Sequence, residues 1–233
     1  MIEIGGLQKT TLIDYPGRVA ATVFLIGCNF RCPFCYSAEL VLPEKIKEQP
    51  RIPEDVFFDF LKERKGLLEG VVVCGGEPTI NKDLPDFLKK IKEYGFLIKL
   101  DSNGSNPEVL KKLINEKLID YIAMDVKAPK EKYEKAVGVK IDKEKIEKSI
   151  NLLKEEGVDY EFRTTVVSKI HSKEDIVKIA KWIGPANRYY LQIFRAEKTI
   201  NPEFENITSY PDEFFSETKK EISHFFKVCE IRG

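Results

Sequence analysis

Six apolar runs alternate with amphipathic stretches along this 233-residue chain, and that alternation limits the folds open to it. The runs have the length and the β-branched and aromatic residues of buried strands, whereas the stretches between them repeat apolar residues at helical spacing. Strands that are apolar throughout and separated by helices indicate a parallel sheet with crossovers. Six units are too few for a closed eight-fold barrel, so we expect an α/β fold, a partial (β/α)6 barrel of the TIM type.

The elements of this barrel can be placed approximately. We expect strands at residues 19–27, 70–76, 96–104, 120–129, 158–167 and 187–196. We expect helices at residues 53–68, 83–95, 106–117, 142–157, 172–184 and 210–226. In a barrel of this design the active site lies at the carboxyl ends of the strands, so the loops after them are the candidate site.

The composition limits location and partners. Lys plus Arg and Asp plus Glu number 38 each, so no net charge favours nucleic acid or an anionic membrane as partner. No apolar run approaches the ~20 residues of a membrane span, and the first residues lack the features of a signal peptide. We expect a single domain over residues 1–233, in the cytoplasm, where thiols stay reduced.

Three of the five cysteines, Cys28, Cys32 and Cys35, stand in one loop after the first apolar run, in the segment CNFRCPFCY. In a reducing compartment clustered thiols more often bind metal than form disulfides. Structural zinc needs four ligands, and neither Cys74 nor Cys229 is an evident fourth. A 4Fe–4S cluster on three cysteines would leave one iron open for a substrate or cofactor. A zinc site with a borrowed ligand and three metal-free cysteines are the less favoured interpretations.

Polar residues follow the carboxyl ends of the later strands as well. In CGGEPT (74–79), Gly75 and Gly76 would let the backbone approach a ligand, and Glu77 could accept a hydrogen bond from an ammonium group. Taken alone, a tight turn capping the next helix explains this segment better. In MDVKAP (124–129), Asp125 and Lys127 lie two residues apart and so on one side of a strand, where burial is costly unless they are paired or functional.

Further candidates are isolated residues. Arg163 could bind a carboxylate or a ribose hydroxyl, or form a salt bridge with a strand neighbour. Gln192 and Ile193, on the sixth expected strand, could line one side of the site. His171 and His224 occur in charged helical contexts, so both are expected at the surface.

The loop C-x3-C-x-aromatic-C after the first strand, with GGEP after the second, resembles the signature of radical S-adenosylmethionine (SAM) enzymes. The resemblance implies that Cys28, Cys32 and Cys35 hold a 4Fe–4S cluster and that SAM chelates its open iron. An electron from the cluster then splits the sulfonium, and the resulting 5′-deoxyadenosyl radical abstracts a hydrogen atom. The resemblance also implies that Phe34 and Gln192 lie near the adenine. It further implies that Gly75, Gly76 and Glu77 hold the methionine amino group.

The segments DSNG (101–104) and DVK (125–127) resemble the D-T-N-G and D-L-K loops of glycyl-radical enzyme activating enzymes. There the aspartates lie beside the methionine carboxylate and a monovalent cation, and the lysine contacts the cofactor. The resemblance extends these roles to Asp101, Ser102, Asp125 and Lys127. Ser102 replaces the threonine and keeps its hydroxyl.

The segment GLQKTTLIDYPG (6–17) resembles the start of the proteins that activate anaerobic ribonucleoside-triphosphate reductase. This implies an oxidoreductase that makes a glycyl radical on a partner enzyme, with anaerobic ribonucleotide reductase expected as partner and flavodoxin or ferredoxin as electron donor. One departure is Tyr36 and Ser37, where those proteins usually carry His-Asn.

Two alternatives stay open beside this function. One is a radical SAM enzyme that acts on a small molecule, similar to 7-carboxy-7-deazaguanine synthase. The other is a non-catalytic iron–sulfur or zinc protein. For the activating enzyme, the long polar segment at residues 192–213 is expected to flank the open side of the barrel, where a peptide loop would enter.

Overall fold

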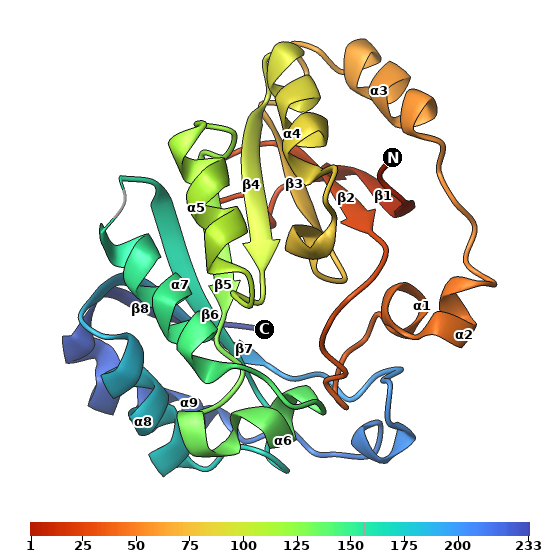
Figure 1. The fold of residues 1–233 in the computed structure, drawn as a ribbon. Helices are drawn as coiled ribbons and strands as arrows, with labels where there is room; N and C mark the ends of the chain where they lie inside the picture. The colour runs from red at the N-terminus through yellow and green to blue at the C-terminus, as the bar shows by residue number, and fades with distance from the viewer. Residues whose placement is uncertain (156) are drawn as a thin grey trace.

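The computed structural model describes residues 1–155 and 157–233, and an eight-stranded sheet runs through them (Figure 1). Its strands are β1 (Ile4–Thr11), β2 (Ala20–Leu25), β3 (Gly70–Gly75), β4 (Leu97–Ser102), β5 (Tyr121–Asp125), β6 (Asp159–Val166), β7 (Ala186–Ile193) and β8 (Phe226–Arg232). The strands lie in sequence order, so each pairs with the next along the chain. The β1–β2 pair is antiparallel and all the other pairs are parallel.

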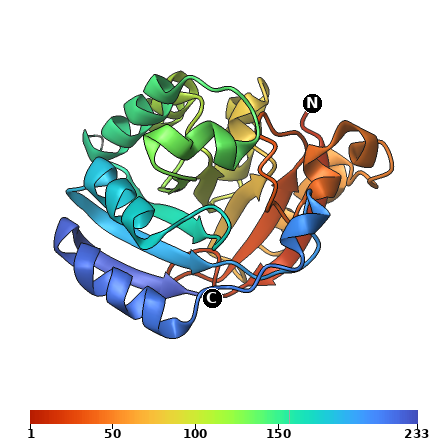
Figure 2. The same ribbon diagram turned by 90° about the horizontal axis from the view of Figure 1, so that it is seen from below.

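Helices join the parallel strands and cover the outer face of the curved sheet (Figure 2). The longer ones are α3 (Glu54–Glu63), α4 (Leu84–Glu93), α5 (Pro107–Asn115), α7 (Lys143–Glu155), α8 (Lys173–Ile183) and α9 (Asp212–Ile222). Three short helices, α1 (Ala38–Val41), α2 (Pro43–Ile46) and α6 (Tyr133–Val137), lie at the end to which the parallel strands point (Figure 1). No helix among the described residues is both long enough and apolar enough to cross a membrane.

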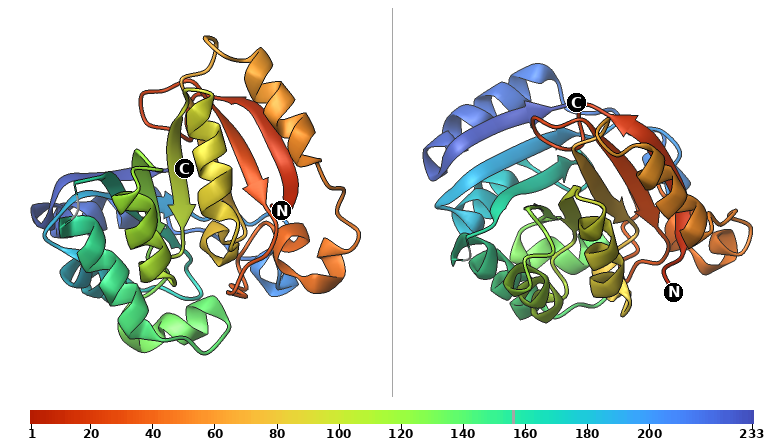
Figure 3. Two further views of the ribbon diagram at one scale, coloured as in Figure 1. Left: turned by 45° about the horizontal axis from the view of Figure 1, so that its top comes forward. Right: turned by 90° about the horizontal axis from the view of Figure 1, so that it is seen from above.

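The predicted partial parallel barrel is confirmed, and the structure adds a strand at each edge, β1 and β8 (Figure 3). The expected last helix ends at Ile222, and β8 begins at Phe226. An edge strand that is only half covered lacks the continuous apolar run of a central strand. Cys229 is the one buried residue of β8, which explains why the sequence of this strand lacks the apolar pattern of a buried strand.

The loop between β1 and β2 closes the amino-terminal end of the barrel. Tyr15 is buried there against Ala20 and Val72, and its ring lies 6.1 Å from that of Tyr121. Asp14 accepts a hydrogen bond of 2.8 Å from the hydroxyl of Thr22. The turn with the sequence DYPG (14–17), a D-x-P-G turn, therefore forms the floor of the barrel. The opposite end is the one that can receive a ligand.

Candidate functional site

A cavity of about 500 Å³ lies inside the barrel at the carboxyl ends of the strands, and the candidate site residues line it, with the exception of Ile193. They are Cys28, Cys32, Phe34, Cys35, Gly75, Gly76, Glu77, Asp101, Ser102, Asp125, Lys127, Arg163 and Gln192. Each of the strands β2 to β7, or the loop after it, contributes to this set. Parallel strands end at one edge of the barrel, which explains why side chains far apart in the sequence meet there.

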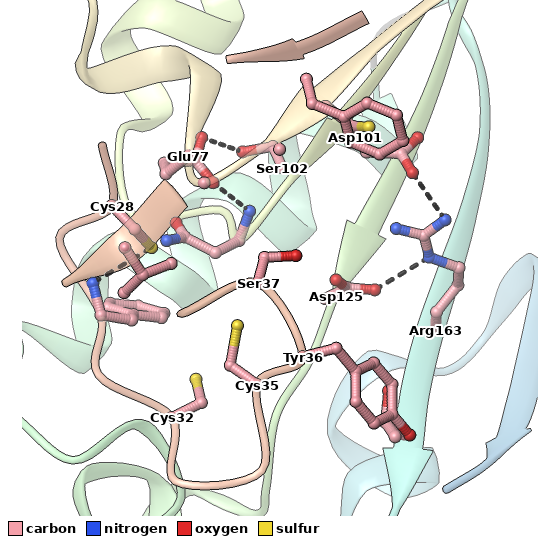
Figure 4. A pocket seen from close by; sticks show the side chains of 18 of the residues that line it. Cys28, Cys32, Cys35, Tyr36, Ser37, Glu77, Asp101, Ser102, Asp125 and Arg163 are labelled. Carbon is pink, nitrogen blue, oxygen red and sulfur yellow. Dashed lines mark hydrogen bonds and ion pairs between the residues drawn. The ribbon is translucent and has the colours of Figure 1, made fainter. Parts of the chain in front are cut away.

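The thiols of the cysteine loop (residues 28–36) face a common space at one side of the cavity (Figure 4). All three are free, with Cys32 buried and Cys28 and Cys35 partly exposed. Burial raises the pKa of Cys28 to about 11 and that of Cys32 to about 12, and the nearby ammonium of Lys127 opposes both shifts. Such thiols stay protonated near neutral pH until a metal displaces the proton.

Three thiols on one loop are a donor set of the kind that zinc and iron–sulfur clusters take. Among residues 1–155 and 157–233, no three His, Cys, Asp or Glu side chains lie close enough to share one metal ion. Zinc draws its thiolates to about 2.3 Å from one centre, whereas the irons of a cluster stand apart and accept thiolates that are further from one another. Cys28, Cys32 and Cys35 all line the cavity, so a group that they hold would border it.

The loop after β5 holds the cysteine loop from one side. The N–H of Arg31 donates to the carbonyl of Val137 (2.8 Å), and its guanidinium donates to the carbonyl of Cys28 (2.6 Å). Gly138 follows α6 with φ of 71°, and a Cβ there would overlap the carbonyl of Arg31. Only glycine allows this approach without displacing the cysteine loop.

A strap, residues 194–204, holds the cysteine loop from the other side. The N–H of Ile200 donates to the carbonyl of Cys35 (3.0 Å), and the N–H of Asn201 donates to that of Pro33 (2.9 Å). The segment expected beside the opening of the barrel is thus bonded to the cysteine loop.

The residue Tyr36, which departs from the pattern of the activating enzymes, contributes to this contact. Its ring stacks on that of Phe194 at 5.7 Å and 6°, and its hydroxyl accepts a hydrogen bond of 2.8 Å from the N–H of Arg195. Phe34 meets the same Phe194 ring edge-on at 6.5 Å. Tyr36 therefore joins the cysteine loop to the strap through both its ring and its hydroxyl.

The two glycines of CGGEPT are required by the chain's own backbone. At Gly75, φ is +116° and a Cβ would overlap the backbone of Leu25; at Gly76 a Cβ would overlap the carbonyl of Gly27. The N–H of Glu77 donates to that same carbonyl (2.7 Å). The pair packs the end of β3 against the start of the cysteine loop, a requirement that holds whether or not a ligand is present.

Glu77 is 1% exposed, and its carboxylate is already bonded within the protein. The donors are the N–H (3.1 Å) and hydroxyl of Thr79, the hydroxyl of Ser102 (2.9 Å) and the N–H of Asn103 (2.6 Å). Burial raises the pKa of this carboxyl, and the hydrogen bonds act in the opposite direction. The side chain ties together the loops after β3 and β4, a role that the sequence does not reveal.

Five side chains form a charged row, and all of them except Lys99 line the cavity: Lys99, Asp101, Arg163, Asp125 and Lys127 (Figure 4 shows the centre of the row). Arg163 donates to Asp101 (2.9 Å) and to Asp125 (2.8 Å), and Lys127 donates to Asp125 (2.9 Å). Burial alone would raise the pKa of both aspartates, but Arg163 and the lysines outweigh it and lower both pKa values. With three cations and two carboxylates, the row carries a net positive charge.

The contacts of this row answer two questions that the sequence left open, the pairing of Asp125 and Lys127 and the partners of Arg163. Asp125 and Lys127 are paired with each other, and both residues line the cavity. Arg163 pairs with carboxylates of two neighbouring strands at once. Lys99, which is 1% exposed and paired with Asp101, was not among the candidates. The signal for it was a lone lysine in the middle of an otherwise apolar run, FLIKL.

The expectation that His171 lies at the surface is wrong, whereas His224 is exposed as expected. The His171 ring is 1% exposed and bonded on both nitrogens, to Val167 N (3.0 Å) and to the carbonyl of Lys127 (2.8 Å). The loop after β6 folds back against the loop after β5, a tertiary contact that its charged sequence neighbours do not indicate.

Comparison with known proteins agrees with this geometry. A family model described as the radical SAM superfamily matches residues 22–207. A Methanocaldococcus jannaschii protein provisionally named a glycyl-radical enzyme activating enzyme is 38% identical over 211 residues, 88% of this chain and 85% of that protein. The pyruvate formate-lyase-activating enzyme of Streptococcus mutans is 28% identical over 78% of this chain and 73% of its own length.

Other relatives are more distant. The 7-carboxy-7-deazaguanine synthase of Thermococcus kodakarensis is 24% identical over 72% of this chain and 73% of its own length. Among solved structures, Escherichia coli QueE matches with a TM-score of 0.56 at 14% identity, over 97% of this chain and 92% of that one. Streptococcus suis SuiB matches with a TM-score of 0.61 at 16% identity over 89% of this chain, which spans about half (47%) of SuiB. The two structures share the fold.

Proposed function

This chain belongs to the radical SAM superfamily, and from that membership we propose that it activates a glycyl-radical enzyme by generating the glycyl radical on it. The observation that supports this most is the shared cavity: three thiols face it from one side, and the charged row faces it from the other. The 38% identity to the M. jannaschii protein and the relationship to an activating enzyme of S. mutans support the choice within the superfamily.

The residues that line the cavity fit the expected cofactors. Cys28, Cys32 and Cys35 would hold the cluster. Together the cluster and SAM supply a 5′-deoxyadenosyl radical, which takes a hydrogen atom from the substrate. Lys127 and Arg163, as the cationic members of the row that line the cavity, would receive the methionine carboxylate. Cations in a buried wall attract a carboxylate strongly because little water screens them.

Further contacts are proposed for the remaining residues. Phe34 and Gln192 would flank the adenine, and Ser102 and the backbone of Gly75 and Gly76 would border the methionine end. Glu77 would accept a hydrogen bond from the methionine ammonium in addition to those that its carboxylate already accepts within the protein. A monovalent cation would fit poorly beside Asp101 and Asp125, because three cationic side chains already neutralise these two carboxylates.

The partner proposed is an anaerobic ribonucleotide reductase, and the electron donor a flavodoxin or ferredoxin. The start of the chain, with its D-x-P-G turn, supports that partner, and Tyr36 and Ser37 are the departures from its pattern. A reducing, cytoplasmic location suits free thiols and an oxygen-sensitive cluster.

The test is anaerobic reconstitution with iron and sulfide, reduction, and addition of SAM with the reductase from the same organism. A glycyl radical signal on the reductase, detected by electron paramagnetic resonance, together with 5′-deoxyadenosine, is the expected result. The triple variant Cys28→Ala, Cys32→Ala, Cys35→Ala should give neither. If SAM is cleaved but no partner protein acquires a radical, the activating function is wrong although the superfamily chemistry stands.

A second candidate is a small-molecule enzyme similar to 7-carboxy-7-deazaguanine synthase. The observation in its favour is the T. kodakarensis enzyme of that name, which is 24% identical over 72% of this chain and 73% of its own length. Turnover stimulated by a pterin or purine-like compound, with no effect of any glycyl-radical enzyme, would establish it. A protein that binds iron but never cleaves SAM would instead be the non-catalytic alternative.

A further inference from the structure

We propose that His171 is a positioning residue of the cofactor site, which fixes the backbone of Lys127 and thereby the ammonium that faces the cysteine loop. The inference rests on the proposed function, because it concerns the cluster and SAM. Its basis is the junction between the loop after β5 and the loop after β6, where the buried imidazole joins the two (2.8 Å to Lys127 O).

The partners of the imidazole define its tautomer. The backbone N–H of Val167 can only donate, so Nδ1 must be the unprotonated acceptor (3.0 Å). The carbonyl of Lys127 can only accept, so Nε2 carries the hydrogen (2.8 Å). Both ring nitrogens are therefore used by the neutral form, and a second proton would leave the Val167 N–H facing another donor.

The backbone around Lys127 has few other ties. Its own N–H lies 3.3 Å from the hydroxyl of Tyr133, a long hydrogen bond. Next to it, the hydroxyl of Thr164 donates to the carbonyl of Val126 (2.8 Å). The His171 contact is the shortest of those made to Lys127's own backbone groups by side chains, so losing it should loosen this residue first.

Lys127 places a positive charge in the cavity that the cysteine loop lines. Its side chain lines the same cavity as Cys28, Cys32 and Cys35. Its ammonium also donates to Asp125 (2.9 Å), which makes Lys127 the last member of the charged row. A cation in this place favours the reduced, more negative form of a cluster and attracts the carboxylate of SAM.

Two substitutions test the hydrogen bonds of the two ring nitrogens separately. In His171→Gln the amide nitrogen can take the place of Nε2 and still donate to Lys127. In His171→Asn the amide oxygen can take the place of Nδ1 and still accept from Val167, but the side chain is too short to reach Lys127. Both leave one backbone group unsatisfied, so both should lower the free energy of unfolding of the iron-free chain to a similar extent.

SAM affinity and the midpoint potential of the reconstituted enzyme should distinguish the two variants. Loss of one hydrogen bond predicts that His171→Asn weakens SAM binding about fivefold and makes the midpoint potential of the cluster more negative. His171→Gln should stay close to wild type in both. His224→Gln, at the exposed histidine, is the matched control and should change neither.

A double-mutant cycle tests the route through Lys127. In a Lys127→Ala background, His171→Asn should cause no further change in SAM affinity or midpoint potential. Equal effects of the Asn and Gln variants, or an effect of His171→Asn that persists without Lys127, would overturn the inference. A wild-type enzyme that forms the cluster but binds no SAM would overturn the proposed function itself, and the inference with it.

Discussion

At the scale of single residues, the cavity wall consists of groups that satisfy one another before any ligand arrives. Glu77 accepts four hydrogen bonds, and Arg163 bridges two carboxylates. Buried polar groups are stable only when they are paired in this way. The cofactor would therefore meet a preformed surface, and several site residues serve the fold as much as the chemistry.

Glu77→Gln should destabilise the chain. The new amide group would point its hydrogens at one of the N–H or O–H donors that now bond the carboxylate, at a cost of about 1–3 kcal/mol. Urea unfolding of the iron-free chain measures this, with Glu108→Gln on the exposed face of α5 as control. A variant as stable as wild type that nevertheless fails to bind SAM would show that Glu77 contacts the cofactor directly.

Stability should also depend on pH through His171. Burial lowers the pKa of this histidine below its usual 6.5 in the folded chain. Below pH 6.5 the unfolded chain binds a proton that the folded chain does not, so the free energy of unfolding falls as the pH drops through that range. The charged side chains that act on the ring are Asp175, whose carboxylate favours the proton, and Lys132, which disfavours it.

The comparison of wild type with His171→Gln isolates this contribution from all other titrating groups. Between pH 7.5 and 5.5, wild type should lose more stability in urea than the variant, which has no imidazole to protonate at this site. Identical losses in the two proteins would mean that His171 keeps its usual pKa in the folded chain.

The sequence predicts the residues of the site far better than their contacts. Asp101, Asp125 and Arg163 could be placed at strand ends, because the period of a strand is regular. That Arg163 joins both aspartates depends on the register of β4, β5 and β6, which no local pattern specifies. His171 was misplaced for the same reason, since its partner Lys127 is distant in the sequence.

At the scale of elements, the strap and the loop after β5 together clamp the cysteine loop. Tyr36 contributes both a stacked ring and an acceptor hydroxyl, although it is 41% exposed. The strands and long helices were predictable from periodicity. The clamp was not, because residues 194–204 have no periodic pattern and are held by single hydrogen bonds to the cysteine loop.

Tyr36→Ala should release the strap more often than Tyr36→Phe. The alanine variant loses the stacking on Phe194 and the hydroxyl, together worth about 1–2 kcal/mol, whereas the phenylalanine variant loses the hydroxyl alone. Limited proteolysis of the iron-free chain, with cut sites mapped by mass spectrometry, should therefore cut within residues 194–204 fastest in Tyr36→Ala. Equal cutting in all three proteins would mean that Tyr36 does not hold the strap.

At the scale of the whole molecule, the barrel has a built floor and an open side. The alternation of six apolar runs sufficed to predict the parallel core. It could not predict β1 and β8, because strands at the edge of a sheet are only partly covered and carry mixed residues. The floor escaped prediction as well, since DYPG gives a turn but not the direction in which Tyr15 points.

Tyr15→Ala should remove the floor of the barrel. The ring fills the space among Ala20, Val72 and Tyr121, and its loss should lower the free energy of unfolding by about 3 kcal/mol. Tyr15→Phe keeps the ring and should stay close to wild type. Urea unfolding of the three iron-free proteins provides the measurement. An alanine variant as stable as wild type would show that the loop does not pack into the barrel in solution.

The clamp on the cysteine loop also sets an order of events during synthesis. The three cysteines leave the ribosome roughly a hundred residues before Val137 and Gly138, and the strap follows later still. Chains fold from the amino terminus as they are made, so the thiols exist for a time on a loop that nothing yet holds. Iron delivered during that interval would meet ligands without a fixed arrangement. Cluster insertion is thus expected after translation, into a finished barrel, and nascent chains are the form most exposed to thiol oxidation.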